Sequence, residues 1–329
     1  MDFKAYLIHQ EEGKVVAGFE RMTEAQLDAG TVTVRVGWSD VNYKDALAAT
    51  GAGKIVRRFP CVGGIDLAGT VVASSDARFQ EGDAVLATGY DVGVAHHGGY
   101  AELARLPGDW LVKLPAGLSA EDAMAFGTAG FTAGLAVVRM EANGLQPANG
   151  PVIVSGATGG VGSLAIGMLA RLGYHVVALT GKAQEADYLK SIGAKEVLLR
   201  QSLDLAKIKP LDRATWAGAV DNLGGEVLAW LASTMQIGGT LASIGLAASH
   251  NLNTSVMPFI LRGVSLLGID SVNCPMPLRT EVWRRLAGDM RPAQLKQMAH
   301  RIEFDQLPTV FDDFIQGRVK GRTVVRIAG

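Results

Sequence analysis

The 329-residue sequence is poor in several features, and each shortage excludes a class of protein. Its two cysteines, Cys61 and Cys274, are too few for a disulfide framework and lack the paired spacing of a structural zinc site. It contains no uninterrupted run of about 18 apolar residues, and no apolar stretch follows a basic one near the N-terminus. We therefore expect neither a membrane span nor an export signal, and these features fit a reducing cytoplasm.

Net charge is also nearly absent. The 31 Lys and Arg residues are balanced by 32 Asp and Glu residues, so the chain has no field that would attract nucleic acid or an anionic membrane. Any basic site must therefore be local. Hydrophobic residues make up 48% of the chain and charged residues 19%, a balance that buries a large core. Because single cores stop growing near roughly 250 to 300 residues, the length predicts two domains.

The pattern along the chain changes near Ser119. Short β-rich runs broken by turns occupy residues 5–115 and predict a β-rich domain. Beyond Ser119, apolar residues at helical spacing alternate with β-branched runs. The β-branched runs are residues 151–154, 175–179, 196–199, 218–221 and 239–244. This alternation predicts an α/β fold with a Rossmann-type, doubly wound parallel sheet.

These patterns also predict the domain boundaries. The doubly wound domain is expected at residues 124–265, where strands and helices alternate. Residues 1–123 and 266–329 are expected to form the other domain, because the tail reads as a helix or two and a final strand at 323–327.

Residues 152–166 read as a strand, a glycine-rich turn and a helix. Glycines allow the backbone to approach a pyrophosphate closely, and the first amides of a helix attract the anion. Such turns also occur for packing alone, but a second strand ending at Thr180 favours the binding interpretation. The residues expected to hold the pyrophosphate are Thr158, Gly159, Gly160, Val161 and Gly162.

The end of that second strand distinguishes between cofactors. NAD enzymes usually place an acid there to bind the ribose 2′-hydroxyl, whereas this chain has Thr180, Gly181 and Lys182. Together with Arg200 after the third strand, these residues predict NADPH, whose 2′-phosphate they could bind. The alternative for Lys182 and Arg200 is that each is a solvated surface cation.

Several motifs in a fixed order resemble those of a known family. They are NYKDA at 42–46, GIDLAGTV at 64–71, GGYAE at 98–102, GTAGFTA at 127–133, ATGGVG at 157–162 and GRTVV at 321–325. This set resembles the medium-chain dehydrogenase/reductase superfamily in its zinc-independent, quinone-reductase-like branch. Within that branch, VNYKDAL at 41–47, GAGKIVR at 51–57 and GYDVG at 89–93 are similar to the NADPH-dependent acrylyl-CoA reductases.

The resemblance implies a GroES-like catalytic domain beside the Rossmann domain, and reduction of acrylyl-CoA to propionyl-CoA. It also implies that no metal is bound: the zinc enzymes of the superfamily have a Cys ligand where this chain has Asn42, and a Gly-His-Glu segment where it has Gly64, Ile65 and Asp66. The adjacent His96 and His97 are interpreted as part of a polar loop. Alternative functions are a quinone or alkenal reductase, or an NADPH-binding protein without catalysis.

By resemblance, Asn42 and Tyr43 lie beside the nicotinamide, with Tyr43 a possible proton donor, and Arg322 points toward the ligand. Capping and packing explain Asn42 nearly as well, and a structural salt bridge explains Arg322. Thr128 and Thr132 are expected near the nicotinamide half, or as simple helix caps.

Strand ends supply the remaining candidates. Leu246, Asp270 and Ser271 follow strands whose carboxyl ends face the ligand crevice, so backbone contacts to the cofactor are expected there. Lys54, Arg57 and Arg58 form the densest cationic cluster of the first domain and are candidates for the CoA phosphates, although solvated clusters of this kind are common. The resemblance further suggests a homodimer with residues 257–261 in the contact; that apolar run could instead belong to the core.

Overall fold

The computed structural model describes residues 2–328 and divides the chain into two compact units. The first unit contains the residues up to Thr128 together with Val272–Thr280 and the residues from Ala299 onward. The second contains Ala129–Ser271 and Glu281–Met298.

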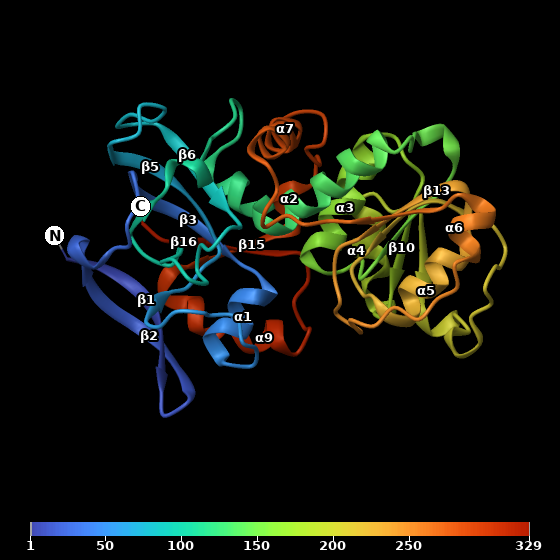
Figure 1. The fold of residues 1–329 in the computed structure, drawn as a ribbon, viewed down its shortest axis with the longest axis horizontal. Coiled ribbons are helices and arrows are strands. Elements are labelled where there is room, and N and C mark those ends of the chain that lie inside the picture. Colours follow the sequence, from blue (N-terminus) through green and yellow to red (C-terminus); the bar gives the residue numbers. More distant parts are fainter. Residues whose placement is uncertain (1, 329) are drawn as a thin grey trace. The chain divides into compact units, whose positions relative to one another are not determined.

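The first unit is built on two β-sheets (Figure 1). β1 (Asp2–Glu11) and β2 (Lys14–Thr23) form an antiparallel pair, and β4 (Cys61–Val62) pairs with the other edge of β1. The larger sheet has the order β15-β16-β3-β5-β6-β8, and β7 also pairs with β3. Its strands are β3 (Val32–Val41), β5 (Asp66–Ser74), β6 (Ala84–Thr88), β7 (Leu103–Leu106), β8 (Val112–Lys113), β15 (Ala299–Glu303) and β16 (Arg322–Arg326). The helices α1 (Tyr43–Thr50) and α9 (Phe311–Ile315) contact each other.

β3 explains why polar residues enter the interior of this unit. Along its first half Val32, Val34 and Val36 are buried and Arg35 is exposed, and the polar Thr33 is buried as well. Its last three residues, 39–41, are all buried, and two of them are polar. The strand thus carries hydrogen-bonding groups into the core.

The second unit contains a six-stranded parallel sheet with the order β11-β10-β9-β12-β13-β14. Its strands are β9 (Val152–Ser155), β10 (Val176–Thr180), β11 (Glu196–Leu199), β12 (Trp216–Asp221), β13 (Met235–Ser243) and β14 (Ser265–Gly268). Every residue of β9, β10 and β12 is buried, as expected when helices cover both faces of a parallel sheet. The helices are α3 (Gly160–Arg171), α4 (Ala186–Ser191), α5 (Gly225–Thr234), α6 (Met257–Arg262) and α8 (Leu295–Met298). The predicted α/β fold class is confirmed.

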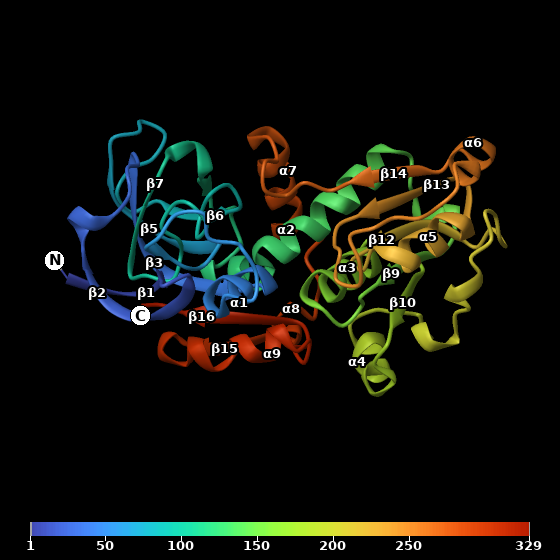
Figure 2. The same cartoon turned by 60° about the horizontal axis from the view of Figure 1, so that its bottom comes forward.

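The strand order reverses at β9, since β10 and β11 extend the sheet on one side and β12, β13 and β14 on the other (Figure 2). Ligands of doubly wound sheets bind where the order reverses, at the carboxyl ends of the strands. The topology therefore marks the ends of β9 and β12 as the first place to look for a site.

Two helices contain residues of both units, α2 (Ala120–Ala142) and α7 (Met276–Ala287). α2 is interrupted at Gly127, whose φ of 51° and ψ of −157° are not helical. Within residues 2–328, α2 has the length and apolar composition to cross a membrane, and 83% of its apolar stretch is buried inside the protein.

The tail differs from the prediction that all of residues 266–329 would join the first domain. Residues Glu281–Met298 belong to the second unit. Trp283 is fully buried there and stacks on Phe131, with ring centroids 6.0 Å apart. The apolar face of α7 thus packs on α2, a long-range contact that periodicity does not reveal.

Candidate functional site

The glycine-rich turn has the geometry that the sequence predicts. β9 ends at Ser155, Gly156 adopts the left-handed conformation with φ of 59°, and α3 begins at Gly160. A Cβ on Gly162 would lie 2.3 Å from the carbonyl oxygen of Gly156, so the turn closes only with glycine at that position. The first amides of α3 have no partner within the helix, and an anion at this end would satisfy them.

The end of β10 carries no acid. Thr180 is buried, and its Oγ1 accepts a hydrogen bond from the backbone amide of Lys182 at 3.0 Å. The carbonyl of Gly181 accepts one from Nε2 of Gln201 at 2.8 Å. Gln201 therefore holds the loop after β10 against the residues that follow β11, and this contact was not anticipated from the sequence.

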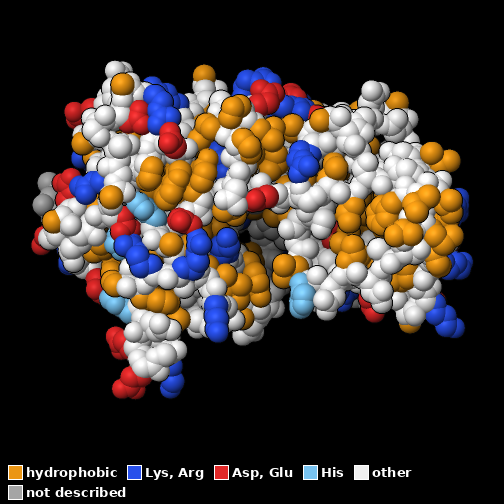
Figure 3. All heavy atoms as spheres, in the orientation of Figure 1, with side chains coloured by type: hydrophobic (Ala, Val, Ile, Leu, Met, Phe, Trp, Pro, Cys, Tyr) orange, Lys and Arg blue, Asp and Glu red, His pale blue; other side chains and the backbone are white. Residues whose placement is uncertain are grey.

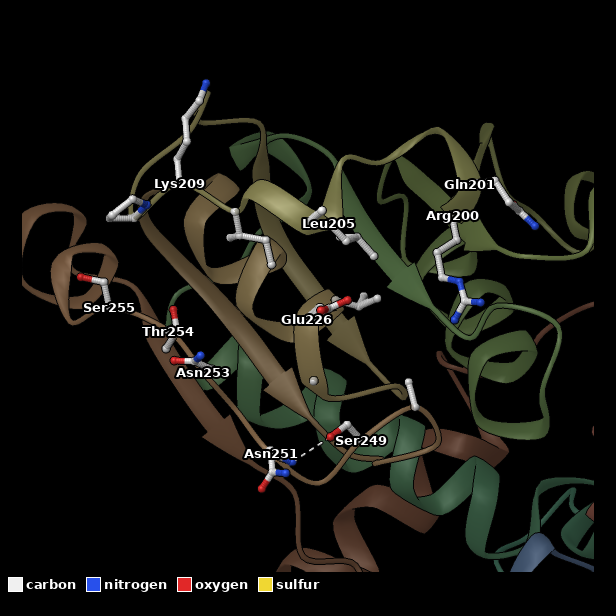
Figure 4. Close-up of a pocket in the computed structure, with 16 residues that line it drawn as sticks. Arg200, Gln201, Leu205, Lys209, Glu226, Ser249, Asn251, Asn253, Thr254 and Ser255 are labelled. Carbon is white, nitrogen blue, oxygen red and sulfur yellow. Dashed lines mark hydrogen bonds between the residues drawn. The ribbon is translucent and has the colours of Figure 1, made fainter.

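Arg200 lies at a hollow of about 1020 Å³ in the second unit. Figure 4 shows Arg200 and Gln201 on one side of it and Asn253, Thr254 and Ser255 on the other, with Glu226 between. Its walls come from the segments after β11, at the start of α5 and after β13. The lining combines amides, hydroxyls and the cations Arg200 and Lys209 with the carboxylate of Glu226 and several apolar side chains, which suits a ligand that bears both a phosphate and an apolar ring.

The other cofactor candidates of this unit are distributed over three places. Leu246 follows β13 and is exposed, and Asp270 and Ser271 follow β14. Because the strands are parallel, these residues lie at the same edge of the sheet as the glycine turn. Thr132 is buried within α2.

Three residues at the ends of β9 and β12 form a brace behind the turn. Ser155 Oγ donates to Asp221 Oδ1 at 2.6 Å, and the amide of Asn222 donates to Ser155 Oγ at 2.9 Å. Asp221 Oδ2 also accepts from the amide of Gly224 at 2.7 Å, and burial raises the pKa of Asp221. The brace fixes the strand ends from which the turn departs.

The first unit contains a buried network made of Asp40, Asn42, Asp45, Asp66 and Arg322. Asn42 lies at its centre: its Nδ2 donates to Asp40 Oδ1 at 2.7 Å and to Asp66 Oδ2 at 2.8 Å, and its Oδ1 accepts from Arg322 Nη1 at 3.2 Å. Asn42 also caps α1 in a reciprocal capping box with Asp45. The structure thus brings Asn42 and Arg322 together and engages the side-chain amide of Asn42 within the network.

Arg322 is the cation of this network. Its Nη2 lies 2.7 Å from Asp40 Oδ2, at an angle that makes the contact an ion pair rather than an aligned hydrogen bond. Both side chains are buried, with exposed fractions of 2% and 0%. Burial, followed by the charge of Asp66, holds the pKa of Asp40 well above its usual range.

Asp45 is the third carboxyl group of the network. It accepts from the backbone amides of Asn42 and Ile65, at 2.8 and 2.9 Å. Burial, followed by the charge of Asp66, raises the pKa of Asp45 to about 7. Because three carboxyl groups share one guanidinium, the fold favours keeping a proton in the network.

Tyr43 differs from its neighbour Asn42 because its side chain is 54% exposed. The cationic cluster is also at the surface: Lys54, Arg57 and Arg58 are exposed. Arg57 forms an ion pair with Asp91, and Arg58 with Asp28 at 2.5 Å.

The positions of the zinc ligands in related enzymes do not fit zinc here. The amide of Asn42 is engaged with two carboxylates, and within residues 2–328 no group of three or more His, Cys, Asp or Glu side chains is placed to hold a metal ion. His96 and His97 lie in the loop between β6 and β7, and both are buried there. Nδ1 of His97 accepts from the amide of Val62 at 3.0 Å, and Nε2 of His96 lies 2.7 Å from the carbonyl oxygen of Arg105.

Comparisons with known proteins agree with this geometry. Residues 28–116 match the alcohol dehydrogenase GroES-like domain, and residues 160–288 match the zinc-binding dehydrogenase family. A probable acrylyl-CoA reductase of Escherichia coli is 48% identical over 98% of this chain and 99% of its own. A putative quinone oxidoreductase of Bacillus subtilis is 47% identical over 99% of both chains.

Solved structures extend the likeness to three dimensions. An oxidoreductase of Salmonella enterica in complex with NADP is 50% identical, covers 99% of this chain and 100% of its own, and has a TM-score of 0.96. A Bacillus subtilis protein with NAD bound is 47% identical, covers 99% of both chains and has a TM-score of 0.97. The chain belongs to the medium-chain dehydrogenase/reductase family, in the branch of the quinone-oxidoreductase-like proteins and acrylyl-CoA reductases.

Proposed function

We propose that this protein uses NADPH to reduce the activated C=C bond of acrylyl-CoA, forming propionyl-CoA. The observation that carries the proposal is the full-length similarity to a protein named a probable acrylyl-CoA reductase. The glycine turn before α3 supplies the amides that a pyrophosphate needs, and β10 ends at Thr180 without an acid.

The residues proposed for the pyrophosphate are those of the turn, Thr158 to Gly162. Lys182 and Arg200 are proposed for the 2′-phosphate, and the hollow at Arg200 offers both polar and apolar lining for a phosphorylated adenosine. Leu246, Asp270, Ser271 and Thr132 remain proposed contacts of the nicotinamide half.

The bound cofactor supplies a hydride to the β-carbon of the substrate. The thioester oxygen then carries negative charge until a proton reaches the α-carbon, so the protein must orient the substrate and stabilise that oxygen. Tyr43 is the proposed residue for ligand contact and proton donation, because its side chain is exposed. Asn42 and Arg322 are proposed to act through the buried network, since their side chains are engaged there.

The test is a comparison of kcat/KM for acrylyl-CoA, benzoquinone and acrolein, each with NADPH and with NADH. We expect acrylyl-CoA to exceed the other two by at least about tenfold, which corresponds to about 1.4 kcal/mol of transition-state stabilisation. For each substrate, kcat/KM should be higher with NADPH than with NADH. A higher value for benzoquinone would establish the quinone reductase alternative, and tight NADPH binding without turnover would establish a non-catalytic binding protein.

We further propose a homodimer joined through the second unit. β14 is an edge strand of the sheet, and α6 precedes it closely in the chain. Ile260 and Leu261 are 72% and 61% exposed, and Figure 3 shows hydrophobic side chains gathered where Figure 1 places α6. A second copy related by a two-fold axis would pair the edge strand and cover this apolar surface.

The proposed compartment is the cytoplasm. The thiols of Cys61 and Cys274 are both buried, which is compatible with reducing conditions.

A further inference from the structure

The side chain of Asn222 has an oxygen that no protein group satisfies. Within residues 2–328, its Oδ1 is buried and lacks a hydrogen-bond partner. The orientation of the amide is fixed by its other end, because Nδ2 donates to the carbonyl of Ser155 at 2.7 Å. The free oxygen therefore cannot exchange places with the nitrogen without losing that bond.

The backbone around Asn222 is equally constrained. Its amide donates to Ser155 Oγ, whose hydroxyl donates to Asp221. Relaxation of this side chain would disturb the brace that holds the ends of β9 and β12. Buried acceptors without a partner are rare in native proteins, and one held by such a brace requires an explanation.

Asn222 lies against the glycine turn. It directly follows β12, which pairs in parallel with β9, the strand that leads into the turn. A Cβ added to Gly156 would lie 3.1 Å from Cβ of Asn222. The side chain of Asn222 thus lies beside the turn proposed for the pyrophosphate.

The chemistry of the oxygen selects its partner. An amide oxygen accepts hydrogen bonds and cannot donate them, so phosphate oxygens, which are acceptors near neutral pH, cannot satisfy it. The groups that flank a dinucleotide pyrophosphate are riboses, and these carry hydroxyl donors.

We propose that Oδ1 of Asn222 accepts a hydrogen bond from a ribose hydroxyl of the bound dinucleotide, and so positions the cofactor on the turn. The inference rests on the proposed function, because it requires that the cofactor be a reduced nicotinamide dinucleotide. It adds a positioning residue that the sequence motif does not include. An asparagine after the fourth strand of the predicted sheet was the signal available in the sequence.

The test is a double-mutant cycle between the protein and the cofactor, measured as dissociation constants by quenching of protein fluorescence. The protein change is Asn222→Ala. The cofactor changes are NADPH analogues that lack one hydroxyl of the nicotinamide ribose, together with adenosine 2′,5′-bisphosphate, which carries the adenosine ribose alone. Asn149→Ala is the matched control, because it also removes a bond between an asparagine and the backbone, at a turn that precedes β9.

We expect Asn222→Ala to weaken NADPH binding about tenfold and Asn149→Ala to leave it unchanged. If the partner is on the nicotinamide ribose, one deoxy analogue binds the wild-type protein about tenfold more weakly than NADPH, and binds Asn222→Ala no more weakly than NADPH does. If the partner is on the adenosine ribose, Asn222→Ala weakens the binding of adenosine 2′,5′-bisphosphate by the same factor.

The assignment would be overturned if each deoxy analogue lost the same affinity relative to NADPH in the wild-type protein and in Asn222→Ala, and if both proteins bound adenosine 2′,5′-bisphosphate equally well. The cofactor proposal would then remain intact. A wild-type protein that binds no reduced dinucleotide would overturn both. The wild-type measurements do not depend on the folding of a variant. If the wild-type protein binds every deoxy analogue as tightly as NADPH, the nicotinamide ribose is excluded as the hydrogen-bond donor to Asn222. If Asn222→Ala fails to fold, the binding of adenosine 2′,5′-bisphosphate is measured with Asn222→Ser instead.

Discussion

The carboxylate of Asp66 accepts two hydrogen bonds from Thr128, one from its backbone amide at 2.7 Å and one from its hydroxyl at 2.5 Å. Thr128 is the residue at which α2 resumes after the break at Gly127, so Asp66 caps the second part of that helix. The same carboxylate accepts from the side chain of Asn42. The side chain of Asp66, the first residue of β5, therefore joins the restart of α2 to Asn42, the residue that caps α1.

The break in α2 should tolerate no side chain. Gly127 has a φ of 51°, and a Cβ there would lie 1.7 Å from Asp40 Oδ2 and 2.7 Å from Arg322 Nη2. We expect Gly127→Ala to lower the free energy of unfolding in urea by about 3 kcal/mol or more. Gly317→Ala is the control, because Gly317 has a similar φ of 63° and open space around it; its cost should be about 1 kcal/mol. If both variants lose a similar free energy of unfolding, Asp40 and Arg322 can move aside for the added Cβ at little cost.

Removing one partner of the buried pair of Arg322 and Asp40 should destabilise the protein, because the groups that remain are buried without compensation. Replacing Arg322 with Leu leaves three buried carboxyl groups without a cation, and we expect a loss of about 3 to 5 kcal/mol in urea unfolding. Arg318→Leu, which removes a pair with Asp313 at the surface, should cost about 0.5 kcal/mol or less.

A double variant separates the charge from the packing of Arg322. Arg322→Leu combined with Asp40→Asn removes both charges of the pair, so it should be more stable than Arg322→Leu alone. If the two losses simply add, the uncompensated charge is not the cause of the effect.

The sequence predicted the features that consecutive residues determine, and it did not predict contacts between residues far apart in the chain. The glycine turn before α3 and the absence of an acid at Thr180 are read from consecutive residues, and the structure has both. The network is different, because Asn42 and Arg322 are 280 positions apart and meet only when β16 pairs with β3. Periodicity gives the strands but not that pairing. For the same reason the packing of α7 against α2 was not predicted.

The Asp45 carboxyl should give the protein an unusual dependence of stability on pH. Its pKa of about 7 in the folded state is above the value of about 3.9 expected in the unfolded chain. Between these values the folded state binds more protons, so the free energy of unfolding falls as pH rises from about 4 to 7, by up to about 1.4 kcal/mol per pH unit from this group. Asp40, whose pKa is raised, acts in the same direction.

The comparison must be made between the wild-type protein and Asp45→Asn. Burial lowers the pKa of His97, and this acts with the opposite sign near pH 6, but it is present in both proteins. Urea unfolding at several pH values should show a less negative slope for the variant. Identical slopes would mean that Asp45 ionises as freely in the folded protein as in the unfolded chain.

The cationic cluster should affect one substrate class and not another. Arg57→Ala combined with Arg58→Ala should raise KM for acrylyl-CoA severalfold and leave KM for benzoquinone unchanged, because benzoquinone has no phosphate to bind. The surface pair of Arg284 and Glu281 offers a control, Arg284→Ala, in the other unit. Equal effects of the double variant on both substrates would assign these arginines to their ion pairs with Asp91 and Asp28.

The apolar surface of α6 should decide whether two copies associate. Sedimentation of the wild-type protein is expected to give twice the chain mass, because burying exposed groups such as Ile260 and Leu261 favours association. Ile260→Asp combined with Leu261→Asp places two charges in the proposed contact and should give a monomer with an unchanged circular dichroism spectrum. Val16→Asp changes an exposed apolar residue of the first unit and should remain a dimer. If the α6 variant still sediments as a dimer, the two copies meet through a different surface.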